Sequence, residues 1–170
     1  MADTTLPAIV AAAVLVFWAV GAYNRLVRLR NDLLRAFPAV DAQFQARQAA
    51  LMRWAEGLAA QAQPADAQAL AALHAAARQA ETACGHARAH PARAGAVTSL
   101  RLAEDILAHS RAALGPDGEG PDAALAEADT ALAFARRRFN ETAELYNHAV
   151  SQFPTWVIAA VFGFRKAGTL

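Results

Sequence analysis

The chain has 170 residues, 56% of them hydrophobic, and a formal net charge of +1 at pH 7. So small a net charge excludes the strong positive field of a nonspecific nucleic-acid binder, and the single cysteine, Cys84, excludes an intramolecular disulfide framework. Much of the apolar fraction is alanine, the strongest helix former, and alternating runs of β-branched residues are scarce. The composition therefore predicts an all-α protein without a nucleic-acid partner.

An uncharged apolar segment runs from Leu6 to Ala22 near the start of the chain. Extended to Tyr23 as a helix, it would measure roughly 27 Å, close to the thickness of a bilayer's hydrocarbon core. Only Asp3 is ionisable before it, and the sequence at 19–22 is a poor cleavage site, which favours an uncleaved anchor over a signal peptide. We expect residues 1–23 to form a transmembrane anchor.

Four arginines follow the anchor and form a basic collar: Arg25, Arg28, Arg30 and Arg35. Positive residues that flank a membrane span stay on its cytoplasmic side. We therefore expect the N-terminus outside and the remaining chain in the cytoplasm, with the protein held in the inner (cytoplasmic) membrane by one span.

Beyond the anchor, apolar side chains recur every three or four residues from Leu26 to Leu58, as on one face of a helix. The anchor is therefore expected to continue directly into the domain. Pro38 lies within this stripe and is expected to kink the helix without ending it, because the stripe keeps its phase across the proline. A full break at Pro38 is the alternative.

Turn signals at 63–66, 90–91 and 115–122 separate three further predicted helices. The expected inward residues of the second and third helices are Leu70, Leu73, Ala77, Ala80, Cys84 and Ala87, and then Val97, Leu100, Ala103 or Glu104, and Leu107. On the fourth, large side chains are spaced by seven, with small residues three positions on, a pattern typical of bundle packing: Leu125, Leu132, Phe139, Tyr146 and Phe153. Residues 24–152 are thus predicted to form an antiparallel four-helix bundle.

The C-terminal tail, residues 153–170, is apolar up to Phe164 and then basic. Its apolar part is too short to span a bilayer. We add the expected lengths of the helices at ~1.5 Å per residue, with successive helices running in opposite directions. The sum places the tail at the height of the basic collar. Two placements follow. The tail lies at the membrane surface, with Trp156 and Phe162 in the interface and Arg165 and Lys166 on anionic headgroups, or it folds against the base of the bundle.

Several polar residues occupy positions where a structural role competes with binding. Arg47 interrupts the apolar stripe, and a buried guanidinium needs a partner, for which Asp41 and the asparagines of the last helix are available. We favour a structural clamp over a ligand contact. Two asparagine pairs are each spaced by seven, and we favour an amide ladder that fixes helix register over binding: Asn24 with Asn31, and Asn140 with Asn147.

No cofactor, metal or catalytic site is expected. His86 and His90 share a helical face, but Cys84 points roughly opposite and a fourth ligand is missing. The glycine-rich stretch at 115–122 lacks the lysine of a P-loop, and no serine, histidine and acid carry a nucleophile signature.

Two blocks resemble the LemA family of bacterial membrane proteins: YNRLVRLRNDLLRAFPAVDAQFQAR, from Tyr23 to Arg47, and RRRFNETAELYNHAVSQFPTWVIAAVFGF, from Arg136 to Phe164. The resemblance implies an N-terminal transmembrane helix followed by a long-helix bundle. The sequence departs from the family pattern after Arg47, where Ala49 and the stretch 50–55 replace an aspartate and a Leu-Ile-Pro-Asn-Leu-Val segment.

The family is mostly without an assigned activity, so the resemblance informs architecture more than function. We expect a non-enzymatic scaffold that binds membrane or cytoplasmic proteins or its own copies. The alternative is a membrane-shaping or lipid-binding protein that grips the bilayer with the basic collar and the C-terminal tail.

Overall fold

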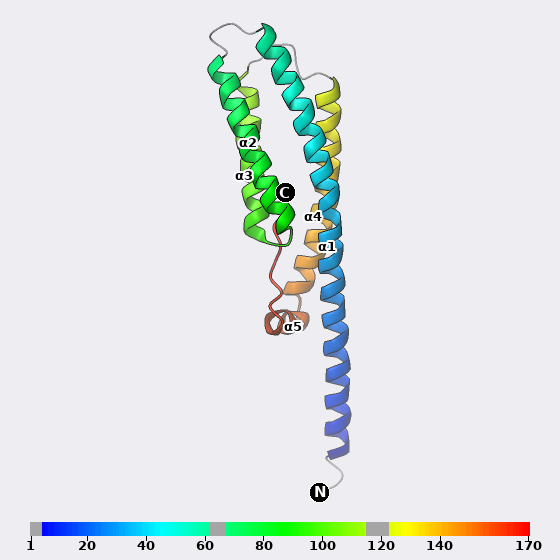
Figure 1. The fold of residues 1–170 in the computed structure, drawn as a ribbon. Coiled ribbons are helices and arrows are strands. Elements are labelled where there is room, and N and C mark those ends of the chain that lie inside the picture. Colours follow the sequence, from blue (N-terminus) through cyan, green and yellow to red (C-terminus); the bar gives the residue numbers. More distant parts are fainter. Residues whose placement is uncertain (1–4, 62–66, 115–122) are drawn as a thin grey trace.

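The computed structural model describes residues 5–61, 67–114 and 123–170, and within them the chain forms five helices and no strand (Figure 1). Their bounds are α1 Thr5–Gln61, α2 Ala67–Ala89, α3 Ala94–Ala112, α4 Ala123–Ser151 and α5 Thr155–Val161. The predicted all-α class is confirmed. The turn expected at 63–66 and the loop expected at 115–122 lie outside the described residues.

Helix α1 is continuous over 57 residues, with Pro38 inside it. The alternative of a full break at the proline is therefore wrong. Phe37 and Val40, on either side of Pro38, are both buried in the same apolar face, so packing holds the helix together where one backbone hydrogen bond is lost.

The first part of α1 stands clear of the remaining protein (Figure 1). Its large apolar side chains are exposed, Phe17 by 79% and Leu15 by 64%. By length and composition α1 can cross a membrane. This agrees with the predicted anchor. From Ala22 onward one face of the same helix is buried, so a single helix changes from an unpaired span to a core element.

The long helices pack mainly in two pairs, α1 with α4 and α2 with α3, and α1 also contacts α2. In Figure 1, α1 and α3 run away from the N-terminal end and α2 and α4 return toward it. Phe37 of α1 and Phe139 of α4 meet edge to face, with ring centroids 5.7 Å apart. Aromatic pairs of this geometry add stability beyond the apolar area that they bury.

All the inward residues predicted for the second and third helices are buried in α2 and α3. On α4, Leu125, Leu132, Phe139 and Tyr146 are buried as predicted. Phe153 is not, since 76% of it is exposed. The heptad spacing continues in the sequence, but α4 ends at Ser151 because Pro154 disfavours a helical backbone at the residue before it.

After α5 the chain turns back at Gly163, whose φ of +72° is in the left-handed region that favours glycine. The remaining residues run extended toward the lower ends of α2 and α3 (Figure 1). Gly168 packs directly on α3: a Cβ there would lie 2.9 Å from the Ala94 carbonyl oxygen. The tail therefore closes over the domain end from which the anchor emerges.

Candidate functional site

The C-terminal tail docks beside the end of the anchor. Helix α5 contacts both α1 and α4, and its residues Thr155, Ile158 and Ala159 are buried. The ring of Tyr23 on α1 lies 4.8 Å from that of Phe162 and 5.9 Å from that of Phe164, between centroids. These contacts bring the tail to the height of the basic collar, as the length argument predicted. They also agree with the alternative in which the tail folds against the base of the bundle.

Two asparagines of α4 hold the extended end of the tail. The side chain of Asn147 donates to the Ala167 carbonyl at 2.9 Å and accepts from the Ala167 amide at 2.7 Å. Asn140 does the same with Leu170, at 2.7 and 2.8 Å. Two carboxamides spaced by seven thus pair with the backbone of residues 167 and 170 as a neighbouring strand would.

The amide ladder predicted between two helices is therefore wrong for Asn140 and Asn147. Their partners are backbone groups of the tail. Asn24 and Asn31 are exposed on α1. A backbone acceptor and donor leave no side-chain signal in a sequence, so the spacing of seven indicated a shared face without indicating its partner.

The residues proposed for a membrane interface are exposed. All four collar arginines have exposed side chains, as do Arg165 and Lys166 in the tail. Trp156 is 50% and Phe162 58% exposed. The fold brings Arg30, Phe162 and Arg165 to one cleft and leaves the other collar arginines outside it.

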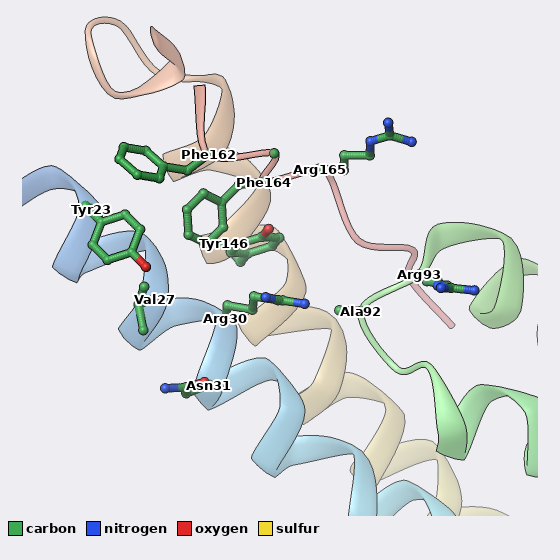
Figure 2. Close-up of a pocket in the computed structure, with 11 residues that line it drawn as sticks. Tyr23, Val27, Arg30, Asn31, Ala92, Arg93, Tyr146, Phe162, Phe164 and Arg165 are labelled. Carbon is green, nitrogen blue, oxygen red and sulfur yellow. The ribbon is translucent and has the colours of Figure 1, made fainter. Parts of the chain in front are cut away.

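This cleft, called the basic cleft below, has a volume of about 430 Å³ and lies between α1, α4, the α2–α3 link and the tail (Figure 2). Figure 2 shows aromatic rings of Tyr23, Phe162 and Phe164 at one end and Arg30, Arg93 and Arg165 around the remainder. Tyr146 lines it from α4. Arg93 and Tyr146 were not among the residues predicted for an interface, because only the fold brings the α2–α3 link to the anchor.

The electrostatics of the basic cleft are dominated by arginine. Burial raises the pKa of Tyr146 above its ordinary value of 10.0, although the nearby charge of Arg30 opposes the rise. The tyrosine is therefore a neutral hydroxyl at physiological pH, able to donate one hydrogen bond and accept others.

Arg47 belongs to a separate buried cluster at the level of α3. Its guanidinium donates to the Glu104 carboxylate at 2.6 Å, and both side chains are nearly fully buried. Arg136 of α4 binds the second oxygen of the same carboxylate. The predicted structural clamp agrees with this pairing, but the predicted partners were wrong. Glu104 is the partner because α3 carries it on its buried face.

Asp41 pairs instead with Arg88 of α2, through two hydrogen bonds of 2.9 and 2.6 Å. It also accepts from Cys84 Sγ at 3.4 Å. Burial raises the pKa of Asp41, but the hydrogen bonds from Arg88 and Cys84 and the Arg88 charge outweigh it, so the pKa lies below the ordinary value of 3.8. This pair joins α1 to α2.

The rings of His86 and His90 pack edge to face at 5.6 Å. Among the residues that the structure describes, no three His, Cys, Asp or Glu side chains are placed to hold a metal ion.

Comparison with known proteins gives one match. The model of the LemA family matches residues 122–170, which include α4, α5 and the extended end of the tail. The resembling block from Tyr23 to Arg47 lies outside the matched residues. No curated protein and no solved structure matches the chain. The match confirms the resemblance to the LemA family over residues 122–170.

Proposed function

We propose that this protein is a non-enzymatic scaffold of the bacterial inner membrane. In this proposal the N-terminus is outside, the anchor spans the bilayer once, and residues 24–152 form an antiparallel four-helix bundle in the cytoplasm that binds other proteins or copies of itself. The observation that carries it is the continuity of α1, which is exposed and apolar in its first part and buried in the core thereafter. A bundle built on the anchor's own helix has a fixed height and direction relative to the membrane.

The outward faces of α3 and α4 support binding of a protein partner. Four large apolar side chains are exposed on them by 44% to 62%: Leu102, Ile106, Phe134 and Leu145. Phe134 lines a groove of about 580 Å³ between α1 and α4, together with Asp32, Arg35 and Arg138. An apolar centre with a charged rim is the usual composition of a protein interface.

A photo-crosslinker placed at Phe134 in the full-length protein, in native membranes, tests this role. We expect a discrete crosslinked product whose mass identifies either a second copy or another protein. The matched control is the same crosslinker at Gln79, exposed on α2. Equal or absent products at the two positions would count against an interface at Phe134.

A second candidate function, lipid binding by the tail, is favoured by the position of α5. This helix lies at the domain end from which the anchor emerges (Figure 1). It buries one face on α1 and α4 and exposes Trp156 and Val161, and Phe162 directly after it is also exposed. An exposed apolar face next to Arg165 and Lys166 suits the interface of an anionic membrane.

Flotation of the fragment 23–170 with anionic liposomes tests lipid binding by the tail. We expect binding that is lost when Trp156 and Phe162 are both replaced by serine. The control replaces Phe134 and Leu145 by serine, which removes as much exposed apolar surface away from α5. Circular dichroism checks that each fragment is folded. A fragment that stays with the liposomes after the first change, or that never binds, contradicts the second candidate.

A further inference from the structure

The basic cleft contains three arginines from three separate parts of the chain. Arg30 comes from α1, Arg93 from the link before α3, and Arg165 from the tail. None of them makes an ion pair with any described residue, whereas Arg47, Arg88, Arg111 and Arg136 all do. Three exposed guanidinium groups that line one cleft give it a positive potential, which attracts an anion.

A tyrosine of the core also lines this cleft. Tyr146 is only 2% exposed, and it lines the cleft without a hydrogen-bond partner among the described residues. Buried tyrosines normally find a partner for the hydroxyl. At the cleft the Tyr146 hydroxyl is free to bond to a group held there.

The helix dipole of α3 adds to the positive potential. Arg93 is the N-cap residue, it provides no side-chain cap, and the first turn of α3 carries no acidic residue. The free amides and positive dipole end of a helix favour an anion. One arginine guanidinium can bind a phosphate through two parallel hydrogen bonds. Phosphate is therefore the anion that this set of donors suits best.

The surroundings of the cleft favour a phosphate that belongs to a lipid. Tyr23 and Phe162, at one end of the cleft, form an apolar wall next to the end of the anchor. Arg30 follows Tyr23 by seven residues, about 10 Å along the helix. The polar layer on each side of a bilayer is roughly 5–8 Å thick, and an arginine stem can bring its charged end back toward it. A lipid headgroup is therefore within reach of the cleft.

We propose that the basic cleft binds the phosphate of an anionic phospholipid, with Arg30, Arg93 and Arg165 around the phosphate oxygens and Tyr146 donating its hydroxyl. This inference rests on the second candidate function and assigns it a defined headgroup site. The lipid fixes the tail, the α2–α3 link and the anchor to one another. The bundle is then oriented by a bound lipid as well as by its span.

Native mass spectrometry of the full-length protein in a neutral detergent tests the site. The probes are phosphatidylglycerol, phosphatidylcholine as the lipid without net charge, and glycerol phosphate as the soluble source of the same phosphate. We expect phosphatidylglycerol to bind at least about tenfold more tightly than either alternative. Phosphatidylcholine carries a cationic group that the arginines repel, and glycerol phosphate lacks the acyl chains that an apolar wall can cover.

Substitutions of single arginines distinguish lipid binding at the basic cleft from lipid binding at the collar. Arg30→Ala and Arg93→Ala are each expected to weaken phosphatidylglycerol binding about tenfold, and Tyr146→Phe a few-fold with the packing retained. Arg25→Ala and Arg28→Ala, exposed arginines outside the cleft, are the matched controls and should change affinity less than about twofold.

Equal losses for Arg28→Ala and Arg93→Ala would overturn the site, because they indicate diffuse attraction to the collar. Equal affinity for glycerol phosphate would overturn the lipid source. Liposome flotation of the unsubstituted fragment 23–170 keeps this result distinct from the second candidate function. A fragment that floats, while the full-length protein shows no preference for phosphatidylglycerol, overturns the cleft site alone. A fragment that does not float overturns the second candidate function.

Discussion

Asn147 holds Ala167 through both polar atoms of its side chain, at 2.9 Å to the carbonyl and 2.7 Å to the amide. Asn140 repeats the arrangement on Leu170. A single carboxamide that satisfies a donor and an acceptor of one residue fixes the direction of that segment as well as its position. The end of the tail is therefore a structural part of the domain.

Replacing both asparagines by alanine should release residues 167–170 and leave the long helices folded. Each of the four lost hydrogen bonds contributes about 0.5–1.5 kcal/mol, so local opening of the tail should become easier by about 2–6 kcal/mol. Hydrogen exchange at the Ala167 and Leu170 amides measures it. Thr130→Ala, which removes a hydroxyl bonded only within α4, is the control. Unchanged exchange in the double variant would show that the asparagines do not hold the tail.

Glu104→Gln should cost about 3–5 kcal/mol of unfolding free energy, because it leaves the buried guanidinium of Arg47 without its counter-charge. The double variant Arg47→Met with Glu104→Leu should recover most of this loss, since an apolar pair can replace a buried ion pair. Urea unfolding in one detergent measures both. Glu141→Gln, at an exposed site on α4, should stay within about 0.5 kcal/mol.

The Asp41–Arg88 pair predicts a dependence of stability on pH. The folded-state pKa of Asp41 lies below its ordinary value. Its stabilisation is therefore fully present above about pH 4 and is lost as the pH falls through the folded-state pKa. The stability difference between the native chain and Asp41→Asn should shrink from pH 6 toward about pH 3. Asp32→Asn, an exposed carboxylate on the same helix, is the control. A difference that grows on acidification would reverse the assigned sign.

Cys84 should be nearly unreactive in the folded protein. Burial, and then the hydrogen bond and charge of Asp41, raise the pKa of its thiol to about 12. Because the thiolate is the reacting form, alkylation at neutral pH should proceed only through opening of α2 from α1. Iodoacetamide labelling with and without urea measures this. Rapid labelling of the folded chain would place Cys84 outside the core.

Local patterns predicted the helices and their buried faces well. The three-and-four spacing identified Leu73 and Val97 as core residues, since burial of one helix face follows from the period of the helix. The same spacing predicted that α1 continues through Pro38. The prediction that Phe153 is buried was wrong, because the spacing of seven contains no information about the neighbouring Pro154. The proline prevents α4 from continuing.

The cleft and the clamp depend on contacts between distant segments. Arg47 could be identified as buried, but Glu104 is 57 residues away, and its height beside Arg47 depends on the packing of α3. Arg93 follows a turn signal and looks like any solvent arginine in the sequence. It becomes part of a site only because the tail folds back past the α2–α3 link.

We propose that the anchor and the C-terminal tail contact the membrane together. Quenching by brominated lipids in proteoliposomes tests it directly, with single-tryptophan variants of the full-length protein that retain Trp18, Trp54 or Trp156. Trp54 follows Tyr23 by 31 residues, about 46 Å along α1, and is the control outside the bilayer. We predict strong quenching of Trp18, clear quenching of Trp156 by lipids brominated near the headgroup, and none of Trp54. Quenching of Trp156 no greater than that of Trp54 would contradict contact between the tail and the membrane.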